Sequence, residues 1–205
     1  MQVIEDRVSD RAAARRSQIV EATIVTIAEL GYQRATFIEI AKRAPLSSTR
    51  LISYHFRSRD ELMAQVATEV VNGLGSAVHA RVTKARSPAA MVRAYIKANI
   101  AYMDSHRPEM AALTSLLFAG ALKLSPEQSS AGVEGLTAII TAGRRIGQFR
   151  DVDPVVAATI VQRAVEGVPL HLREHPGADL TAHAAELVRF FDAALLAAVT
   201  DPTRR

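Results

Sequence analysis

The stretch that decides the fold is residues 36–62, TFIEIAKRAPLSSTRLISYHFRSRDEL. Its first part carries an apolar stripe with the i, i+3, i+4, i+7 spacing of one helix face, made of Phe37, Ile40, Ala41 and Ala44. Pro45 disfavours a helical conformation at Ala44, so we expect a tight break there. A further helix begins at Ser47 or Ser48. The stretch therefore predicts two short helices joined by a tight turn.

The second of these helices has two different faces. Its apolar residues are placed to face inward and are Leu51, Ile52 and Phe56. Its outward residues are Thr49, Arg50, Ser53 and Tyr54. This arrangement is typical of a helix-turn-helix, in which Arg reads guanine edges, Ser or Thr reads several bases, and residues such as Tyr54 and His55 reach phosphates. A chance pair of helices that does not bind DNA is the alternative.

Positive charge is concentrated in the same part of the chain. The whole protein carries a formal charge of +4, but between Gln33 and Arg59 six basic residues stand against one acid, which gives +5 locally. The rest of the chain is close to neutral. A basic cluster on a balanced protein favours contact with phosphate groups. An ordinary solvated helix face is the alternative.

Helix start signals recur along the whole chain. Capping-box spacing occurs at 36–39 and 58–61, and a capping residue precedes a proline at 87–88, 125–126 and 153–154. The expected helices are 10–30, 36–43, 48–55, 58–84, 88–105, 107–123, 126–148, 153–174 and 179–199. The sequence predicts an all-α protein of about nine helices, with a three-helix head and one antiparallel helical bundle from about residue 60 onward.

Composition excludes several classes of protein. The chain is 49% hydrophobic and contains no cysteine, which excludes disulfide frameworks and thiolate metal sites. Residues 1–16 lack the apolar segment of a secretory signal, and charges interrupt every apolar stretch before it could span a bilayer. We therefore expect a soluble, cytoplasmic protein with no membrane partner.

We expect no enzymatic activity, no cofactor and no metal site. The six histidines form no recognised metal pattern, and the pair His171 and His175 lacks the acidic partner of a zinc-binding helix. The sequence contains no glycine-rich phosphate loop and no nucleophile signature. An all-helical enzyme would need a cluster of ionisable groups that the sequence does not show.

The region from Arg16 to Val66 resembles the DNA-binding domain of the TetR family. The resemblance rests on the order and spacing of Gly31-Tyr32, Ile40-Ala41, residues 51–56 (LISYHF) and residues 58–62 (SRDEL). It implies a recognition helix at about 48–54, a homodimer, and phosphate contacts from Tyr54, His55 and Arg59. It also implies that residues 1–57 bind DNA and that residues 58–205 bind an effector and dimerise. The candidate DNA-binding residues are Thr36, Ser47, Ser48, Thr49, Arg50, Ser53, Tyr54, His55 and Arg59.

The turn departs from the usual family pattern in two ways. Pro45 replaces the usual glycine, and one extra residue stands between Ala44 and Phe56, around Ser48-Thr49. Because each helical residue advances by about 100°, an insertion there changes which side chain meets which base. If the turn closes as usual, Ser47 or Ser48 caps the helix through a backbone N–H and neither reads bases freely.

The last helix, 179–199, offers material for a dimer interface with the helix before it. One apolar stripe is Leu180, Ala184, Leu187, Phe191, Leu195 and Ala198, and a second is Val188, Leu196 and Val199. Two stripes with small alanines between them favour a partner helix, because one stripe would suffice for a monomer core. A helix buried inside one body is the alternative.

The resemblance implies an effector pocket, which we expect among the helices from about 88 to 173. Pockets of this kind are mostly apolar with a few polar groups. The candidate lining residues are Tyr95, Asn99, Tyr102, Met103, Met110, Leu117, Phe118 and Glu166, each of which is otherwise ordinary core or surface. If Glu166 is buried, its carboxylate would bind a cationic ligand. The alternative is that its side chain points to solvent. Pro169 should kink its helix and free the carbonyl of Val165.

These features predict a homodimeric, ligand-responsive repressor that binds a near-palindromic DNA operator and is released by a small, largely apolar molecule. The alternative is a helical sensor that binds small molecules and acts through protein contacts without DNA. An occluded basic face, or binding that does not respond to salt, would favour that alternative.

Overall fold

The computed structural model describes residues 2–44 and 48–197, with side chains from residue 11 onward. The described residues form ten α-helices and one 3-10 helix and contain no β-strand, which confirms the all-α prediction. No helix in these ranges is long and apolar enough to cross a membrane. Contacts between Cα atoms divide the chain into a first unit, 1–72 with 106–124, and a second unit, 73–105 with 125–205.

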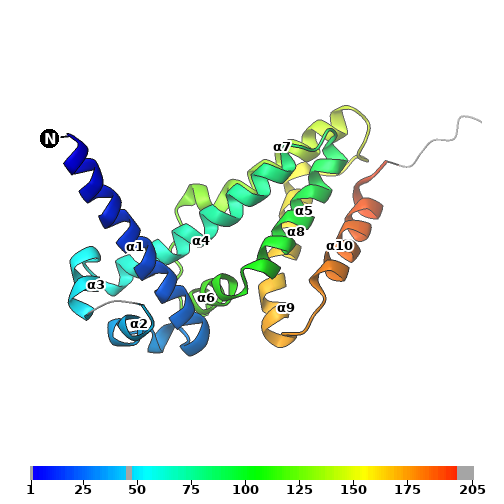
Figure 1. Cartoon of the computed structure of the whole chain (residues 1–205). Helices are drawn as coiled ribbons and strands as arrows, with labels where there is room; N and C mark the ends of the chain where they lie inside the picture. The colour runs from blue at the N-terminus through cyan, green and yellow to red at the C-terminus, as the bar shows by residue number, and fades with distance from the viewer. Residues whose placement is uncertain (1, 45–47, 198–205) are drawn as a thin grey trace, which may run out of the picture. The chain divides into compact units, whose positions relative to one another are not determined.

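The first unit is the helical head. It contains α1 (Gln2–Leu30), η1 (Tyr32–Arg34), α2 (Phe37–Arg43), α3 (Thr49–His55), the first part of α4 (Arg59–Val82) and α6 (Arg107–Phe118). Figure 1 shows α2 and α3 beside the C-terminal half of α1, whose N-terminal turns extend past them. Ile27, Ile40, Ile52 and Phe56 are almost completely buried in one apolar core. The inward faces predicted for α2 and α3 are therefore confirmed at these positions.

One helix does not lie where the sequence placed it. The region 107–123 was expected in the bundle, but α6 packs against α1 and adds Ala112 and Leu116 to the core of the head. The Tyr32 backbone N–H also donates to the Ser115 hydroxyl, 2.9 Å away. The head is therefore built from two separate segments of the chain.

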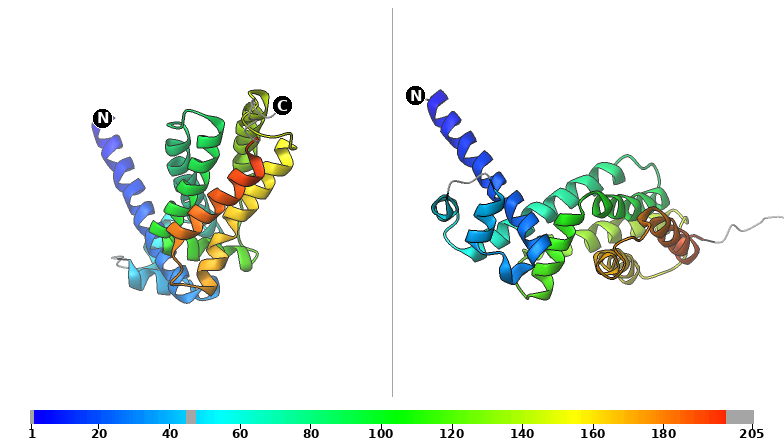
Figure 2. Two further views of the ribbon diagram at one scale, coloured as in Figure 1. Left: turned by 90° about the vertical axis from the view of Figure 1, so that its right-hand side faces the viewer. Right: turned by 60° about the horizontal axis from the view of Figure 1, so that its bottom comes forward.

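The second unit contains the end of α4 and five further helices. These are α5 (Pro88–Ser105), α7 (Pro126–Arg145), α8 (Pro154–Glu166), α9 (Val168–Glu174) and α10 (Leu180–Leu195). α7 packs on α8 and on α5, and α10 packs on α5, where Arg93 Nε lies 2.9 Å from a carboxylate oxygen of Asp192. The left view of Figure 2 shows α10 running beside α8 and α9.

The helix expected at 153–174 is two helices. α8 ends at Glu166 and α9 begins at Val168, with Gly167 between them. Pro169 lies in the first turn of α9, where its missing N–H costs no hydrogen bond. The proline predicted to kink a continuous helix therefore marks the start of a new one.

The proline-based helix starts are confirmed in the second unit. Asp153 accepts from the N–H groups of Val155 and Val156, each at 2.9 Å. Ser125 forms a complete capping box with Gln128, which the sequence analysis had not assigned. These local bonds fix the beginnings of α7 and α8.

Candidate functional site

The exposed face of α3 is the centre of the candidate DNA interface. Ile52 and Phe56 anchor the helix in the core, and Arg50, Ser53 and Tyr54 are exposed. Tyr54 has 82% of its surface open to solvent, which is far more than a packed aromatic residue keeps. Thr49 is half-buried, and its carbonyl accepts the Ser53 hydroxyl at 3.3 Å. The face therefore presents one guanidinium, one phenol and one hydroxyl on a rigid helix.

The start of α3 does not close as predicted at Ser48. Ser48 occupies the N-cap position, but its side chain makes no capping hydrogen bond. Ser47, together with Pro45 and Leu46, lies outside the described residues. The Ser48 side chain is exposed, and its hydroxyl makes no capping hydrogen bond to the helix backbone.

Thr36 and Ser58 cap their helices, but neither forms the predicted reciprocal box. The Thr36 hydroxyl accepts from Glu39 N–H at 3.3 Å, and the Ser58 hydroxyl accepts from Glu61 N–H at 3.1 Å. The Glu61 carboxylate instead accepts from Arg57 N–H at 2.8 Å. Glu39 pairs with basic side chains of its own helix. The Thr36 hydroxyl is thus already engaged in positioning α2.

Arg59, the predicted phosphate contact at the start of α4, is turned toward the protein backbone. Its Nε donates to the carbonyl of Ala35 at 3.2 Å, and its Nη2 donates to the carbonyl of Tyr32. Its guanidinium carbon also lies 4.0 Å from the centroid of the Tyr32 ring. In this conformation the Arg59 side chain joins the start of α4 to η1 through these hydrogen bonds and the ring contact.

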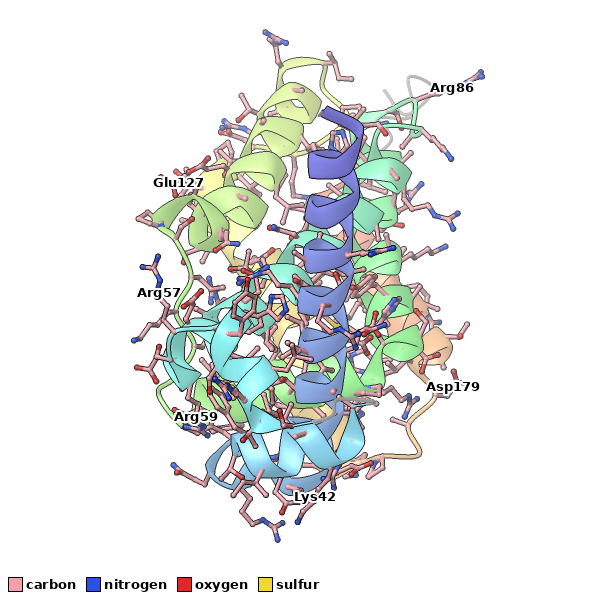
Figure 3. The ribbon with its side chains drawn as sticks, turned by 60° about the vertical axis from the view of Figure 1, so that its left-hand side comes forward. Lys42, Arg57, Arg59, Arg86, Glu127 and Asp179 are labelled. Carbon is pink, nitrogen blue, oxygen red and sulfur yellow. The ribbon has the colours of Figure 1, made fainter. Side chains whose placement is uncertain are left out.

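Arg57 is the exposed basic residue at this place, and it was not among the candidate site residues. In Figure 3 Arg57 and Arg59 lie at clearly separate places, although only Ser58 stands between them in the sequence. The signal that could have identified Arg57 is its membership of the basic cluster between Gln33 and Arg59.

Arg16 fixes the end of α3 to α1. Its Nη1 donates to the His55 carbonyl, its guanidinium lies 4.1 Å from the centroid of the Phe56 ring, and its Nη2 lies 3.8 Å from a Glu61 oxygen. Burial, followed by the charges of Arg16 and Arg15, lowers the pKa of His55. The lowered pKa favours the neutral imidazole of His55, which donates a hydrogen bond but carries no positive charge. Sequence reasoning did not identify this role of Arg16.

The local positive charge is partly neutralised inside the head. Lys42 Nζ lies 2.7 Å from Glu39, and Arg43 Nη2 lies 2.7 Å from Glu29. The hydrogen bond from Lys42 is the largest cause that lowers the pKa of Glu39. Arg50 and Arg57 have no ion pair with any described residue. Arg34 of η1 also has no ion pair with a described residue, so the uncompensated charge of the cluster lies on η1, on α3 and at the residues around the start of α4.

The predicted effector residues fall in both units. Met110, Leu117 and Phe118 belong to α6 in the first unit, where Met110 is buried and the other two are exposed. The remaining five belong to the second unit. Among these, Tyr95, Asn99 and Met103 are buried in α5, and Tyr102 is half-buried.

Three of the second-unit candidates belong to one polar chain. Asn99 Nδ2 donates to the Tyr95 carbonyl at 2.8 Å, and the Tyr95 hydroxyl donates to Gln162 Oε1. Gln162 Nε2 then donates to Glu166 Oε1 at 2.6 Å. Burial and the nearby Glu166 charge raise the pKa of Tyr95 to about 12. Gln162 was missed, although its i, i+4 spacing from Glu166 places both on one helix face.

Glu166 is not the buried carboxylate that would select a cationic ligand. Its side chain is 40% exposed, and Arg163 Nη1 lies 2.5 Å from its second oxygen. The solvent-facing alternative is therefore correct in this structure. Among the hydrogen-bonded side chains from Asn99 to Glu166, the buried polar residues are Tyr95 and Asn99.

The two faces of α10 differ from the stripes that the sequence suggested. The buried face is Leu180, Ala184, Val188, Phe191 and Leu195, so Val188 belongs to the first stripe. The second face exposes Phe190, which was missed and is 65% exposed. Phe190 lines an apolar cavity of about 340 Å³ with Val156 and Ile160 of α8, which are 57% and 53% exposed. Ala198 and Val199 lie outside the described residues.

Comparison with known proteins identifies the head. Residues 19–66 match the model of the bacterial regulatory proteins of the tetR family. The chain is 33% identical to the HTH-type transcriptional regulator BetI of Pectobacterium carotovorum over 106 residues, covering 51% of this chain and 53% of that protein. It is 33% identical to BetI of Yersinia pestis over 115 residues, covering 55% and 57%. The chain thus spans about half the length of the curated relatives it matches.

The fold also agrees with solved structures of regulators. A putative transcriptional regulator from Saccharomonospora viridis, solved with choline, superposes with a TM-score of 0.78 at 18% identity, over 91% of this chain and all of that one. A tetR-family regulatory protein from Rhodococcus RHA1 gives 0.76 at 20% identity, over 90% and 98%. Residues 19–66, which contain the helix-turn-helix of the head, therefore match the tetR family of bacterial regulatory proteins.

Proposed function

We propose that this chain is a homodimeric repressor that binds a near-palindromic operator through α3 and releases it when a small molecule binds the second unit. The observation that carries the DNA-binding part is the exposed face of α3, where Arg50, Ser53 and Tyr54 project from a helix anchored by Ile52 and Phe56. A rigid helix with an outward basic and polar face fits the major groove.

Each exposed side chain has a role set by its chemistry. Arg50 addresses a guanine edge with its two-pronged guanidinium, which discriminates between bases. Tyr54 and Arg57 contact phosphates, which position the protein without reading sequence. Arg59 and Arg16 hold η1, α3 and α4 in place, so they support the interface from behind. Thr36, Ser48, Ser53 and His55 remain polar candidates for backbone or base contacts.

The apolar surface formed by α8 and α10 pairs two copies of the chain. Phe190, Val156 and Ile160 line one apolar cavity, and each keeps more than half of its surface exposed, which suits a surface that a partner covers. Pairing this surface around a two-fold axis buries it on both copies. A dimer that reads adjacent major grooves sets its recognition helices about 34 Å apart.

We propose that the effector binds near the buried end of the hydrogen-bonded side chains on α5 and α8. Tyr95, Asn99 and Gln162 supply polar groups beside the buried apolar side chains of α5 and α8, as small-molecule sites require. The Saccharomonospora viridis neighbour was solved with choline, and another neighbour, AibR, with isovaleryl coenzyme A and operator DNA. The protein releases DNA on binding an effector only if the effector binds more tightly to a second conformation. In that conformation the two recognition helices of the dimer are not spaced to fit adjacent major grooves.

The test is a binding titration of the full chain against genomic DNA fragments over a salt series. We expect at least one fragment to bind more tightly than random DNA, and the affinity for every fragment to fall steeply as salt rises. Random DNA that competes equally with all fragments would refute the repressor. Salt-independent behaviour would instead favour a small-molecule sensor that acts without DNA.

A further inference from the structure

A group of arginines lines a cavity in the second unit. We propose that the end of α7 and the turn after it bind a small molecule through its phosphate group. A cavity of about 380 Å³ opens there, lined by Thr141, Arg144, Arg145, Phe149, Arg150 and Asp151. It shares no lining residue with the apolar cavity between α8 and α10, and none with the polar chain of Tyr95.

The lining of this arginine pocket carries an excess of positive charge. Three guanidinium groups face one carboxylate, and Arg144 uses that carboxylate in an ion pair with Asp151. Arg150 Nε donates to the Leu196 carbonyl at 3.1 Å, which leaves its two terminal nitrogens for another acceptor. Arg145 is exposed and has no ion pair or hydrogen bond with a described residue. Two positive charges of the lining therefore lack a counter-charge.

These arginines are not needed to cap the end of α7. The last carbonyls of the helix accept backbone N–H groups: Ala142 from Ile146 at 3.3 Å, and Gly143 from Gln148 at 2.9 Å. Basic residues in a last turn also offset the negative end of the helix dipole, which accounts for Arg144 and Arg145. It does not account for Arg150, which lies beyond the helix and lines the same cavity.

The floor of the arginine pocket is held by close packing. Phe149 is buried, and its ring lies so close over Gly143 that a Cβ at that position would come within 2.1 Å of a ring carbon. The turn that follows α7 therefore cannot shift without displacing a buried aromatic ring. This packing fixes the backbone from which Arg150 projects.

The chemistry of the lining selects a phosphate dianion. A guanidinium donates two parallel N–H groups, which match two phosphate oxygens, and the two uncompensated charges match a double negative charge. The volume falls within the range of small-molecule pockets and exceeds what one inorganic ion fills. The site therefore takes a phosphate carried on a small organic molecule, with free phosphate as the simpler occupant of the same chemistry.

Binding at this site would act on the end of α10. Arg150 N–H donates to the Leu195 carbonyl at 2.9 Å, and Ala197 N–H donates to the Gln148 carbonyl at 3.0 Å. The turn that supplies Arg150 is thus bonded to the helix that carries Phe190. A phosphate held by Arg150 stabilises this connection and, with it, the apolar surface of α8 and α10.

Calorimetric titration of the full chain without DNA tests the site, at constant ionic strength and with inorganic phosphate, glycerol 1-phosphate and glycerol as probes. We expect saturable binding of the phosphates, no binding of glycerol, and affinity about tenfold or more weaker in Arg145→Gln. Arg81→Gln removes an exposed arginine elsewhere in the second unit and should bind like the natural chain. Thermal unfolding of both variants verifies that they fold.

The probes also separate the two sources of the phosphate. Tighter binding of glycerol 1-phosphate than of inorganic phosphate identifies an organic ligand, and equal binding identifies the free ion. The proposal is overturned if neither phosphate binds saturably, or if Arg145→Gln binds as tightly as the natural chain. Because no DNA is present, failure here leaves the operator-binding function untouched.

Discussion

The guanidinium of Arg59 lies over the ring of Tyr32, 4.0 Å from its centroid, and donates to the carbonyl oxygen of the same residue. This contact joins the start of α4 to η1 across 27 residues of sequence. The side chain that family resemblance assigned to phosphate is therefore part of the scaffold that holds the head together.

Replacing Arg59 by Lys should destabilise the protein while keeping its charge. A lysine cannot reproduce two directed hydrogen bonds and a stacked plane, so the free energy of unfolding should fall by about 1–2 kcal/mol. Urea unfolding of the free protein measures this loss. Arg57→Ala, an exposed neighbour, should change stability by less than about 0.5 kcal/mol. Unchanged stability with uniformly weaker DNA binding would return Arg59 to a phosphate role.

Arg50 and Arg57 should affect DNA binding in different ways. Arg50→Ala removes the proposed base contact, so it should lower the preference for operator over random DNA by about 1–3 kcal/mol. Arg57→Ala removes the proposed phosphate contact and should weaken binding to all sequences, with a salt slope smaller by about one. Electrophoretic titrations at several salt concentrations distinguish the two effects. Identical profiles for both variants would reject this division of roles.

Phe190→Asp should separate the proposed dimer into monomers. A charge placed in the apolar surface of α8 and α10 would have to be buried without a partner, which strongly opposes pairing. Sedimentation analysis should show the variant as a monomer at concentrations where the natural chain is dimeric. Ile146→Asp is the control, because Ile146 is also 65% exposed but does not line that cavity. A variant at Phe190 that stays dimeric would move the interface elsewhere.

In an alkaline titration, the Tyr95 phenol should ionise at a higher pH than the other tyrosines. Its pKa is raised to about 12 by burial and by Glu166, so the folded protein favours the neutral phenol. That contribution to stability is complete below about pH 10 and is lost as the pH rises through about 12. Absorbance titration of the four tyrosines should show a last step that Tyr95→Phe removes and Tyr54→Phe leaves in place. A last step that persists in Tyr95→Phe would contradict the assignment.

Acid should weaken the packing of α9 and α10 through His183. Its ring centroid lies 5.2 Å from that of His171, and burial, with the His171 charge, lowers its pKa. The unfolded chain therefore binds the proton more readily. The stabilising contribution is present above about pH 6.5 and is lost as the pH falls below that value.

The measurement is the difference in unfolding free energy between the natural chain and His183→Gln at pH 7.5 and pH 5.5. Taking a difference removes the contribution of the carboxylates, which both proteins share. The natural chain should lose more stability than the variant on acidification. Equal losses would show that His183 is not the titrating group.

Local signals predicted most of the architecture. Thr36, Ser58, Ser125 and Asp153 cap helices where the sequence placed them, because an N-cap bond joins residues only two or three apart. The inward faces of α2 and α3 followed from helical periodicity, and Ile40, Ile52 and Phe56 are buried accordingly. The exposed Arg50, Ser53 and Tyr54 followed from the same periodicity.

The candidate site was less predictable, because its contacts join residues that are far apart in the chain. Arg16 meets the His55 carbonyl across 39 residues, and Tyr95 meets Gln162 across 67. Nothing in the local pattern distinguishes Arg59, whose donors are held by backbone carbonyls, from Arg57, whose side chain is exposed. Glu166 also lies among apolar neighbours in sequence, yet its helix turns it toward solvent and Arg163.

The sequence by itself determined the helices, the two-sided α3 and the basic cluster, because each depends on the spacing of residues within a few helical turns. Only the tertiary structure decided which arginines are held by other groups of the protein, which face of α10 exposes Phe190, and that α6 completes the core of the head. Those outcomes depend on which side chains packing brings together, and a guanidinium binds whichever carbonyl, ring or carboxylate the fold places within reach.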